Sequence, residues 1–149
     1  MSNKVMNTND APVAKFAEVF VTRNGKRNAM LMCKDFEGKA RMGSVIMGKK
    51  PTTVELSFTM TIYKCTEIFD DVVDEFIKTG VMPLLTIQTS NEDPATSVGR
   101  STKVYNDCVL DGDVLLSMAG SEDDFIEQEI NGFAGGYTRP EKFKDPTYM

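Results

Sequence analysis

The chain has 149 residues, of which 41% are hydrophobic and 26% charged, and its net charge is −5. This length suits one domain with a hydrophobic core, and the composition argues against a globally disordered chain. Its apolar runs are too short to span a bilayer, and its polar first ten residues do not resemble a secretory signal. We therefore expect a single domain, residues 1–149, that is made in the cytoplasm and does not bind membranes.

The sequence contains no histidine. The chain therefore lacks the commonest metal ligand and most familiar catalytic triads. The three cysteines, Cys33, Cys65 and Cys108, are an odd number at wide spacing, which fits neither a disulfide framework nor a Cys-x-x-Cys metal motif. We expect buried thiols, no cofactor, no metal ion and no catalytic residue.

Charge is distributed unevenly along the chain. Residues 1–50 hold ten Lys/Arg against four Asp/Glu, whereas residues 104–149 hold three against ten. A compact nucleic-acid-binding protein is usually basic overall, and this chain is not. Two interpretations stay open: a solvated surface of mixed charge, or attraction between the basic front of one copy and the acidic back of another.

The first elements in chain order read as a loose arm followed by a hairpin. Residues 1–14 are polar and indicate a flexible N-terminal arm. Phe16–Arg23 is rich in aromatic and β-branched residues and predicts a strand. Asn24-Gly25 is a strong hairpin signal, so we expect Asn28–Lys34 to return as a second strand.

The next segment, Asp35–Lys50, contains three glycines and several basic residues. It is either a long loop or an extended hairpin with Arg41–Met47 as one arm. Val54–Tyr63 follows and is the clearest element of the sequence, because apolar and polar residues alternate along it with a period of two. One face of this long strand should be buried, and the other should look at water, a channel or a partner.

One amphipathic helix is predicted over residues 66–79. Thr66 is the expected N-cap, and Gly80 suits the position just after the helix. An apolar stripe begins at Ile68, and acidic residues fill the opposite face. Those carboxylates suggest a Mg²⁺ or acid–base site, but a solvated helix face is the more common explanation.

Strands return after the helix. We predict them at Leu84–Thr89, Thr102–Leu110, Val114–Met118 and Phe125–Phe133. Ser90–Gly99 reads as a loop and Asp111–Asp113 as a hairpin turn. The tail, residues 135–149, reads as an extended arm. The order of elements predicts a mainly β fold, an antiparallel β-sandwich or barrel with one flanking amphipathic helix.

The segment Met47–Gln88 resembles the tail tube, or core, proteins of contractile phage tails, defective prophages and R-type bacteriocins of Gram-positive bacteria. A basic segment, Gly48-Lys49-Lys50, leads into a strand that ends in Tyr-Lys and then into an amphipathic helix. A glycine stop at Gly80 and the strand Pro83–Gln88, of the form Pro-hydrophobic-Thr-hydrophobic-Gln, complete the pattern.

The end of the chain, residues 125–143, is similar to the family's acidic strand followed by Pro-Glu-Lys, and Gly135-Gly136 departs from that pattern. The resemblance implies a structural, non-enzymatic subunit of the inner tube of a contractile tail or phage-tail-like particle. Six copies would form a ring, and rings would stack around a channel for DNA or effectors. Sheath, baseplate and tail-terminator proteins are the implied partners, with DNA only as cargo. Assembly would take place in a bacterial host.

Three groups of residues receive roles from this resemblance, as hypotheses. The lumen-lining row is Glu55, Ser57, Thr59 and Thr61. The contact with the adjacent ring is Lys39, Arg41, Lys49 and Lys50. The sheath-facing side of the helix is Glu67, Asp70, Asp71 and Asp74. Two other functions remain as alternatives, namely a small-ligand-binding β-barrel and an enzyme that works with carboxylates.

Overall fold

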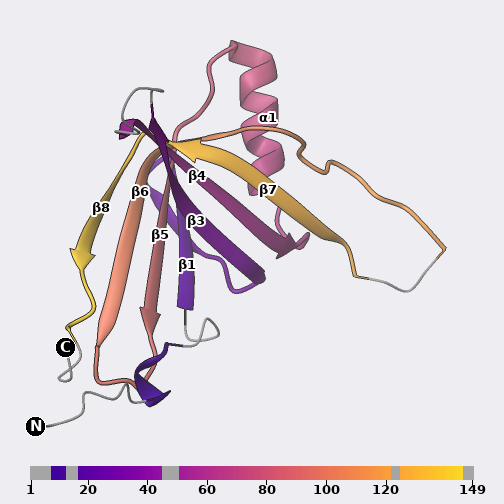
Figure 1. The fold of residues 1–149 in the computed structure, drawn as a ribbon. Coiled ribbons are helices and arrows are strands. Elements are labelled where there is room, and N and C mark those ends of the chain that lie inside the picture. Colours follow the sequence, from indigo (N-terminus) through magenta and orange to yellow (C-terminus); the bar gives the residue numbers. More distant parts are fainter. Residues whose placement is uncertain (1–7, 13–16, 45–50, 122–124, 146–149) are drawn as a thin grey trace, which may run out of the picture.

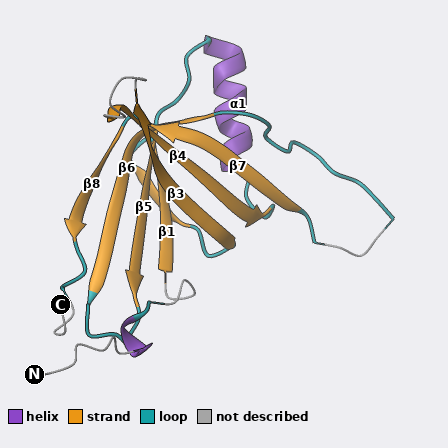
Figure 2. Ribbon diagram, viewed as in Figure 1, coloured by secondary structure: helices purple, strands orange, loops and turns teal. Residues whose placement is uncertain are grey.

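The computed structural model describes residues 8–12, 17–44, 51–121 and 125–145, which form one antiparallel sheet and one helix (Figures 1 and 2). The elements are η1 (Thr8–Asp10), β1 (Ala17–Arg23), β2 (Lys26–Ala29), β3 (Cys33–Ser44), β4 (Pro51–Tyr63), α1 (Ile68–Thr79), β5 (Leu85–Glu92), β6 (Arg100–Leu110), β7 (Glu127–Ala134) and β8 (Gly136–Glu141). The strand order is β2-β1-β5-β6-β7-β4-β3, and β8 also pairs with β6. The predicted fold class is confirmed.

Strand β6 connects two halves of this sheet. One edge pairs with β5, and the other edge pairs first with β8 and then, at Val109 and Leu110, with β7. Asp107 has a φ of 52°, and the β5–β6 register shifts next to it, so the strand bends where it changes neighbours. We call β2, β1, β5, β6 and β8 half-sheet A, and β7, β4 and β3 half-sheet B.

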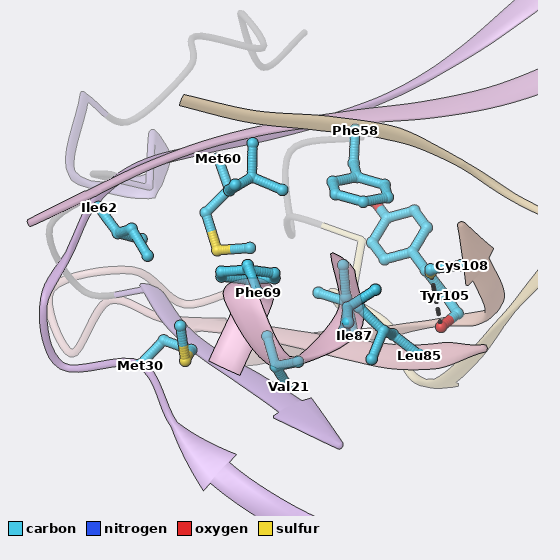
Figure 3. Packing of buried hydrophobic residues seen from close by; sticks show 12 residues of the cluster. Val21, Met30, Phe58, Met60, Ile62, Phe69, Leu85, Ile87, Tyr105 and Cys108 are labelled. Atoms are coloured by element: carbon cyan, nitrogen blue, oxygen red, sulfur yellow. Dashed lines mark hydrogen bonds between the residues drawn. The ribbon is translucent and has the colours of Figure 1, made fainter. Parts of the chain in front are cut away.

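The hydrophobic core lies between the inner faces of the two half-sheets and is closed by the first turns of α1. Its fully buried side chains come from both halves and from the helix: Val21, Leu85, Ile87, Cys108, Met60, Ile62, Ile130, Phe69 and Val72. In Figure 3, Phe69 lies between Met60 and Val21. Fully burying such a side chain contributes about 1.5–3 kcal/mol, so these residues hold the two halves face to face.

The first hairpin confirms one prediction and corrects another. Asn24 and Gly25 have φ of 52° and 77°, the two positive values that a type I′ turn requires. The returning strand begins at Lys26 and ends at Ala29, so the predicted strand Asn28–Lys34 is wrong in its bounds. The buried Met30 interrupts it, because its N–H donates to Val19 and its carbonyl accepts from Cys33 in a turn.

The segment after this turn is a strand, so the loop interpretation of Asp35–Lys50 is wrong and the hairpin interpretation holds. β3 runs for 12 residues and pairs with β4 along most of its length, from Cys33 opposite Ile62 to Ser44 opposite Pro51. The first arm of this hairpin, β3, begins at Cys33, which is earlier than the predicted arm Arg41–Met47. Residues 45–50 lie outside the described part of the chain.

The helix begins at Ile68 rather than at residue 66, and its N-cap lies one residue later than predicted. Glu67 occupies the N-cap position without a side-chain hydrogen bond, whereas the Thr66 hydroxyl accepts a long bond of 3.4 Å from the Ile68 N–H. Gly80 ends the helix in the left-handed conformation, with φ 72°, as predicted. Only the first half of the apolar stripe reaches the core, because Ile77 is 74% exposed.

The last third of the chain differs most from prediction. Val114–Met118 is not a strand, and Asp111–Asp113 is not a hairpin turn, because the chain leaves the sheet after Leu110 and returns only at Glu127 (Figure 1). The predicted extended tail contributes a further strand, since Gly136–Glu141 pairs with β6. The loop predicted at Ser90–Gly99 begins only at Asp93.

Candidate functional site

The outer face of half-sheet B carries polar residues on each of its three strands. The β4 residues Glu55, Ser57, Thr59 and Thr61 alternate with the buried Phe58, Met60 and Ile62, as the period of two requires. Glu55 is exposed, and the other three are half-buried between the neighbouring strands. The row predicted to line a lumen therefore lies on one continuous sheet face.

Neighbouring strands extend this row on both sides, because residues directly opposite in a ladder point to the same face. The β3 residues are Asp35, Glu37, Lys39 and Arg41, and the β7 residues are Glu127, Glu129, Asn131 and Phe133. Thr59 donates to the Asn131 side-chain oxygen over 2.9 Å, which confirms that both point outward. We call this three-strand surface the polar face.

Acidic residues outnumber basic ones on the polar face. Its carboxylates are Asp35, Glu37, Glu55, Glu127 and Glu129, and its cations are Lys39 and Arg41. Lys39 pairs with Glu37 over 3.1 Å. At the rim, Lys34 donates to Glu127 over 3.3 Å, and this hydrogen bond and the carboxylate charge raise the pKa of Lys34. The face is therefore polar, with a net negative charge among the described residues.

The structure brings together two groups that the sequence assigned to different roles. Lys39 lies opposite Ser57, and Arg41 lies opposite Glu55, so both basic residues belong to the polar face rather than to a loop. Lys49 and Lys50, the other members of the predicted contact between rings, lie outside the described residues. The sequence pattern missed this proximity because it did not identify β3 as a full-length strand.

The acidic side of α1 is partly neutralised within the chain. Lys64 and Asp70 form a largely shielded ion pair of 2.8 Å. Arg23, at the end of β1, contacts Glu75 at 3.0 Å and Asp71 at 3.8 Å. These pairs fasten the helix to the sheet, and sequence reasoning missed them because Arg23 lies 52 residues from Glu75.

Three residues of the predicted sheath-facing group remain open to solvent. Glu67, Asp71 and Asp74 are exposed, although Asp71 lies 3.8 Å from Arg23, whereas Asp70 is held by Lys64. The acidic face that can meet a partner is therefore narrower than the sequence predicts.

The three thiols differ in burial: Cys108 is buried, Cys33 is half-buried and Cys65 is exposed, so the expectation of buried thiols is wrong for Cys65. Burial raises the pKa of the Cys33 and Cys108 thiols to about 11, with nearby carboxylates adding to the effect, so both stay protonated near neutrality. No group of three or more potential metal ligands gathers in the described part of the chain. Among the described helices, none is long and apolar enough to cross a membrane.

One open groove, of about 1030 Å³, lies on the inner side of β3. Its walls come from β1, β3, β5 and β6, and its apolar lining includes Val19, Met30, Phe36 and Tyr105. Phe36 and Tyr105 are in contact, with ring centroids 5.9 Å apart. This groove is large enough for a peptide segment or a small ligand.

Comparison with known proteins agrees with this architecture. A family model described as phage tail tube protein matches residues 4–141. No curated protein matches the sequence. A chain of the anti-feeding prophage baseplate, symmetrised six-fold, is similar with a TM-score of 0.60 at 8% identity, over 90% of this chain and 97% of that one.

Two further solved structures share the fold. A chain of the PVC sheath–tube complex, an extracellular contractile injection system in its extended state, has a TM-score of 0.55 at 14% identity, over 91% of this chain and 98% of that one. A chain of the anti-feeding prophage tube-terminating cap has a TM-score of 0.56 at 12% identity, over 88% and 92%. At these identities the likeness shows a common fold.

Proposed function

This chain belongs to the phage tail tube protein family and is a structural subunit of a tail tube, and from this premise we propose that six copies close into a ring. Half-sheet B forms the wall of the central channel, with its polar face toward the lumen. The observation that carries this assignment is the polar face itself, which is three strands wide. The six-fold symmetrised baseplate with a similar chain supports the number of copies.

Ring closure follows from the free edge of half-sheet B. Among the described residues β3 pairs only with β4, so a 12-residue strand keeps one edge without a partner. Such an edge is an aggregation hazard in a monomer, and closing a ring removes it. A contact between two different surfaces of the same chain closes by rotation, and rings that then stack by translation make a tube.

The charge of the polar face suits an anionic cargo. Five carboxylates outnumber the cations Lys39 and Arg41 on the polar face of every copy, and this gives the wall a net negative charge whether or not Arg41 also reaches the next ring. Like charges repel, so DNA or an acidic effector passes along such a wall without adhering to it. Ser57, Thr59 and Thr61 keep the wall hydrated between the charged residues.

Contact between rings is assigned to the tip of the β3–β4 hairpin. Arg41 lies close to this tip, and the segment beyond it carries Lys49 and Lys50, outside the described residues. These cations meet acidic residues of the next ring, whereas Lys39, paired with Glu37, stays in the channel wall. Exposed ion pairs of this kind contribute about 0–1 kcal/mol each, so the stack is sensitive to salt.

The outside of the tube is assigned to α1. Glu67, Asp71 and Asp74 are the exposed carboxylates of its predicted sheath-facing side. Weak, screened contacts with a sheath suit a tube that must slide past it during contraction. Baseplate and terminator proteins are the proposed partners at the two ends, and assembly takes place in the cytoplasm of a bacterial host. The subunit has a structural role, and we propose no catalytic step for it.

Accessibility of single cysteines in assembled tubes tests the orientation of the wall. Thr59→Cys, in a background with Cys65→Ser, should react with a small maleimide that enters the channel but not with a maleimide carried on a large polymer. Asp74→Cys, on the proposed outer surface, should react with both reagents. Reaction of Thr59→Cys with the polymer reagent along intact tubes would contradict the assignment.

A further inference from the structure

The β3–β4 hairpin projects beyond the rest of half-sheet B and carries two exposed apolar side chains. β7 ends at Ala134, opposite Leu56, so the described residues of β4 before Leu56 pair only with β3. Met42 and Val54 lie directly opposite each other in this two-stranded ribbon, with 61% and 55% of their surface exposed. Val54 alternates in step with the buried Phe58, so both side chains belong to the inner, apolar face of half-sheet B. We call Met42 and Val54 the tip pair.

A second exposed apolar surface lies at the other end of the same strands. Tyr63 is the last residue of β4, and its ring meets that of Phe125 edge to face, with the centroids 5.9 Å apart. Phe125 is 83% exposed and Tyr63 is 38% exposed. Tyr63 lies opposite Glu127, so this surface belongs to the polar face of half-sheet B, whereas the tip pair belongs to the inner face. We call Tyr63 and Phe125 the base patch.

The two surfaces cannot cover each other within one copy. From Val54 to Tyr63, β4 spans roughly 30 Å at the rise of an extended strand. Two copies that follow each other along the strand direction bring the tip pair of one copy next to the base patch of the other. Because the two surfaces lie on opposite faces of the sheet, they can then meet face to face, with the ribbon on the polar side of the neighbouring sheet.

The chemistry of the two surfaces is complementary. A thioether and a branched alkyl group on the tip suit two aromatic rings, and sulfur makes favourable contacts with such rings. Three carboxylates, Asp35, Glu127 and Glu129, lie beside the base patch on the polar face, where Lys34 is the one cation among the described residues. By contrast, residues 41–55 hold three Lys/Arg against one carboxylate. The tip is therefore net positive and the base net negative, which favours their association.

We propose that, in the stack of rings proposed above, the tip pair of one copy packs on the base patch of a second copy in the next ring. The contact between rings then has an apolar part beneath the ionic one. Salt screens exposed charges but does not weaken the burial of apolar surface, so the apolar part holds the rings together when the ion pairs are screened. This inference rests on the proposed tube and identifies the surface that receives the hairpin tip.

Cysteine crosslinking in assembled tubes tests this contact. In a Cys65→Ser background, Val54→Cys and Phe125→Cys are combined, and the tubes are treated with a short bismaleimide. Every copy should then be linked to one copy in the ring above and one in the ring below, so a denaturing gel should show a ladder that continues beyond the number of copies in one ring. Each single variant, Val54→Cys or Phe125→Cys, should give no such ladder.

Two outcomes of the crosslinking experiment would overturn the inference. A ladder that ends at the number of copies in one ring would place the contact between neighbours in the same ring. Intact tubes without crosslinks would show that the two surfaces do not meet. Both results leave the proposed function intact, whereas wild-type protein that forms no ring or tube contradicts the proposed function and the inference together.

A pair of variants gives a second readout. Met42→Ser with Val54→Ser should raise the protein concentration needed for tube formation about tenfold or more, because two apolar side chains lose their contact. The increase should be the same at 50 mM and 500 mM salt. Ile77→Ser with Val81→Ser, which changes two apolar residues of 74% and 67% exposure, is the matched control and should change that concentration less than about twofold. An unchanged concentration for the tip variant, or an increase seen only at low salt, would contradict an apolar contact.

Discussion

The ring of Tyr105 on β6 occupies the space into which a side chain at Gly38 on β3 would extend. A Cβ placed on Gly38 would overlap the Tyr105 hydroxyl and approach the ring carbon that bears it, at 2.6 Å. Since β6 belongs to half-sheet A and β3 to half-sheet B, this contact joins the two halves. The rings of Phe36 and Tyr137 lie beside Tyr105, with centroids 5.9 Å and 6.2 Å from its ring centroid, so the contact is part of an aromatic cluster.

Gly38→Ala should therefore destabilise the fold. The added methyl group displaces Tyr105 from a packed position, and overpacking of this kind costs about 1–3 kcal/mol. Urea unfolding of the dilute, unassembled protein measures the change. Gly120→Ala is the matched control, because nothing lies within 4 Å of a Cβ there. A Gly38→Ala protein as stable as the Gly120→Ala protein would show that the contact is not tight.

The ion pair between Lys64 and Asp70 should contribute to the attachment of α1. Both side chains are largely shielded, with exposed fractions of 9% and 17%, so removing the cation leaves a carboxylate with little compensation from water. We expect Lys64→Met to lower the free energy of unfolding by about 1–3 kcal/mol. Lys78→Met, on an exposed position of the same helix, should change it by less than about 0.5 kcal/mol.

A double-mutant cycle separates this pair from general packing. If the pair acts directly, adding Asp70→Asn to the Lys64→Met protein should recover part of the lost stability, because it removes the Asp70 charge that Lys64 no longer compensates. Additive effects of the two substitutions would show that the pair contributes nothing as a pair.

Stability should fall as pH rises through the range in which the buried thiols ionise. The folded-state pKa of Cys33 and Cys108 is raised to about 11, above the ordinary value of 9.0, because burial disfavours the thiolate. The folded chain then holds more protons than the unfolded chain, so the stabilisation is fully present below pH 9 and is lost between pH 9 and about 11. Unfolding measured at several pH values tests this.

Substitution of the thiols supplies the control for that experiment. In Cys33→Ser with Cys108→Ala, the absolute stability falls because core packing is lost, but the decline of stability between pH 9 and 11 should become shallower. Burial also raises the pKa of Tyr105, so a smaller decline remains. The same slope as in the wild type would show that the thiols do not cause it.

Charge at the hairpin tip should govern stacking. Arg41→Glu should raise the concentration needed for tube formation several-fold at 50 mM salt, because repulsion replaces attraction between rings. At 500 mM salt the difference should shrink, since exposed charges are screened within about a Debye length. Lys26→Glu, at the β1–β2 turn, is the control. An effect of Arg41→Glu that does not depend on salt would contradict an electrostatic contact.

The sequence correctly predicted those elements that depend only on residues nearby in the chain. Alternation over Val54–Tyr63 gave β4, Asn24-Gly25 gave the first turn, and Gly80 gave the helix stop, because each depends on backbone conformation or on one buried face. The lumen-facing row was visible for the same reason, although its role is a proposal.

The sequence did not predict those elements whose partners lie far away in the chain. β8 exists because β6 offers it an edge, and nothing in residues 135–149 alone distinguishes a paired strand from a free arm. Val114–Met118 was predicted to be a strand because it is apolar, but it joins no ladder among the described residues. The ion pair of Arg23 with Glu75 joins segments 52 residues apart, and the position of Lys39 and Arg41 beside β4 depends on a register that composition does not reveal.

Electron microscopy of the purified wild-type protein at high concentration and low salt tests the central claim most directly. We predict rings or stacked tubes with a central channel and six-fold symmetry in averaged end views, and a three-dimensional reconstruction should place Glu55, Ser57, Thr59 and Thr61 on the channel wall. A protein that remains monomeric under these conditions, or a tube whose channel is lined by half-sheet A, would contradict the account.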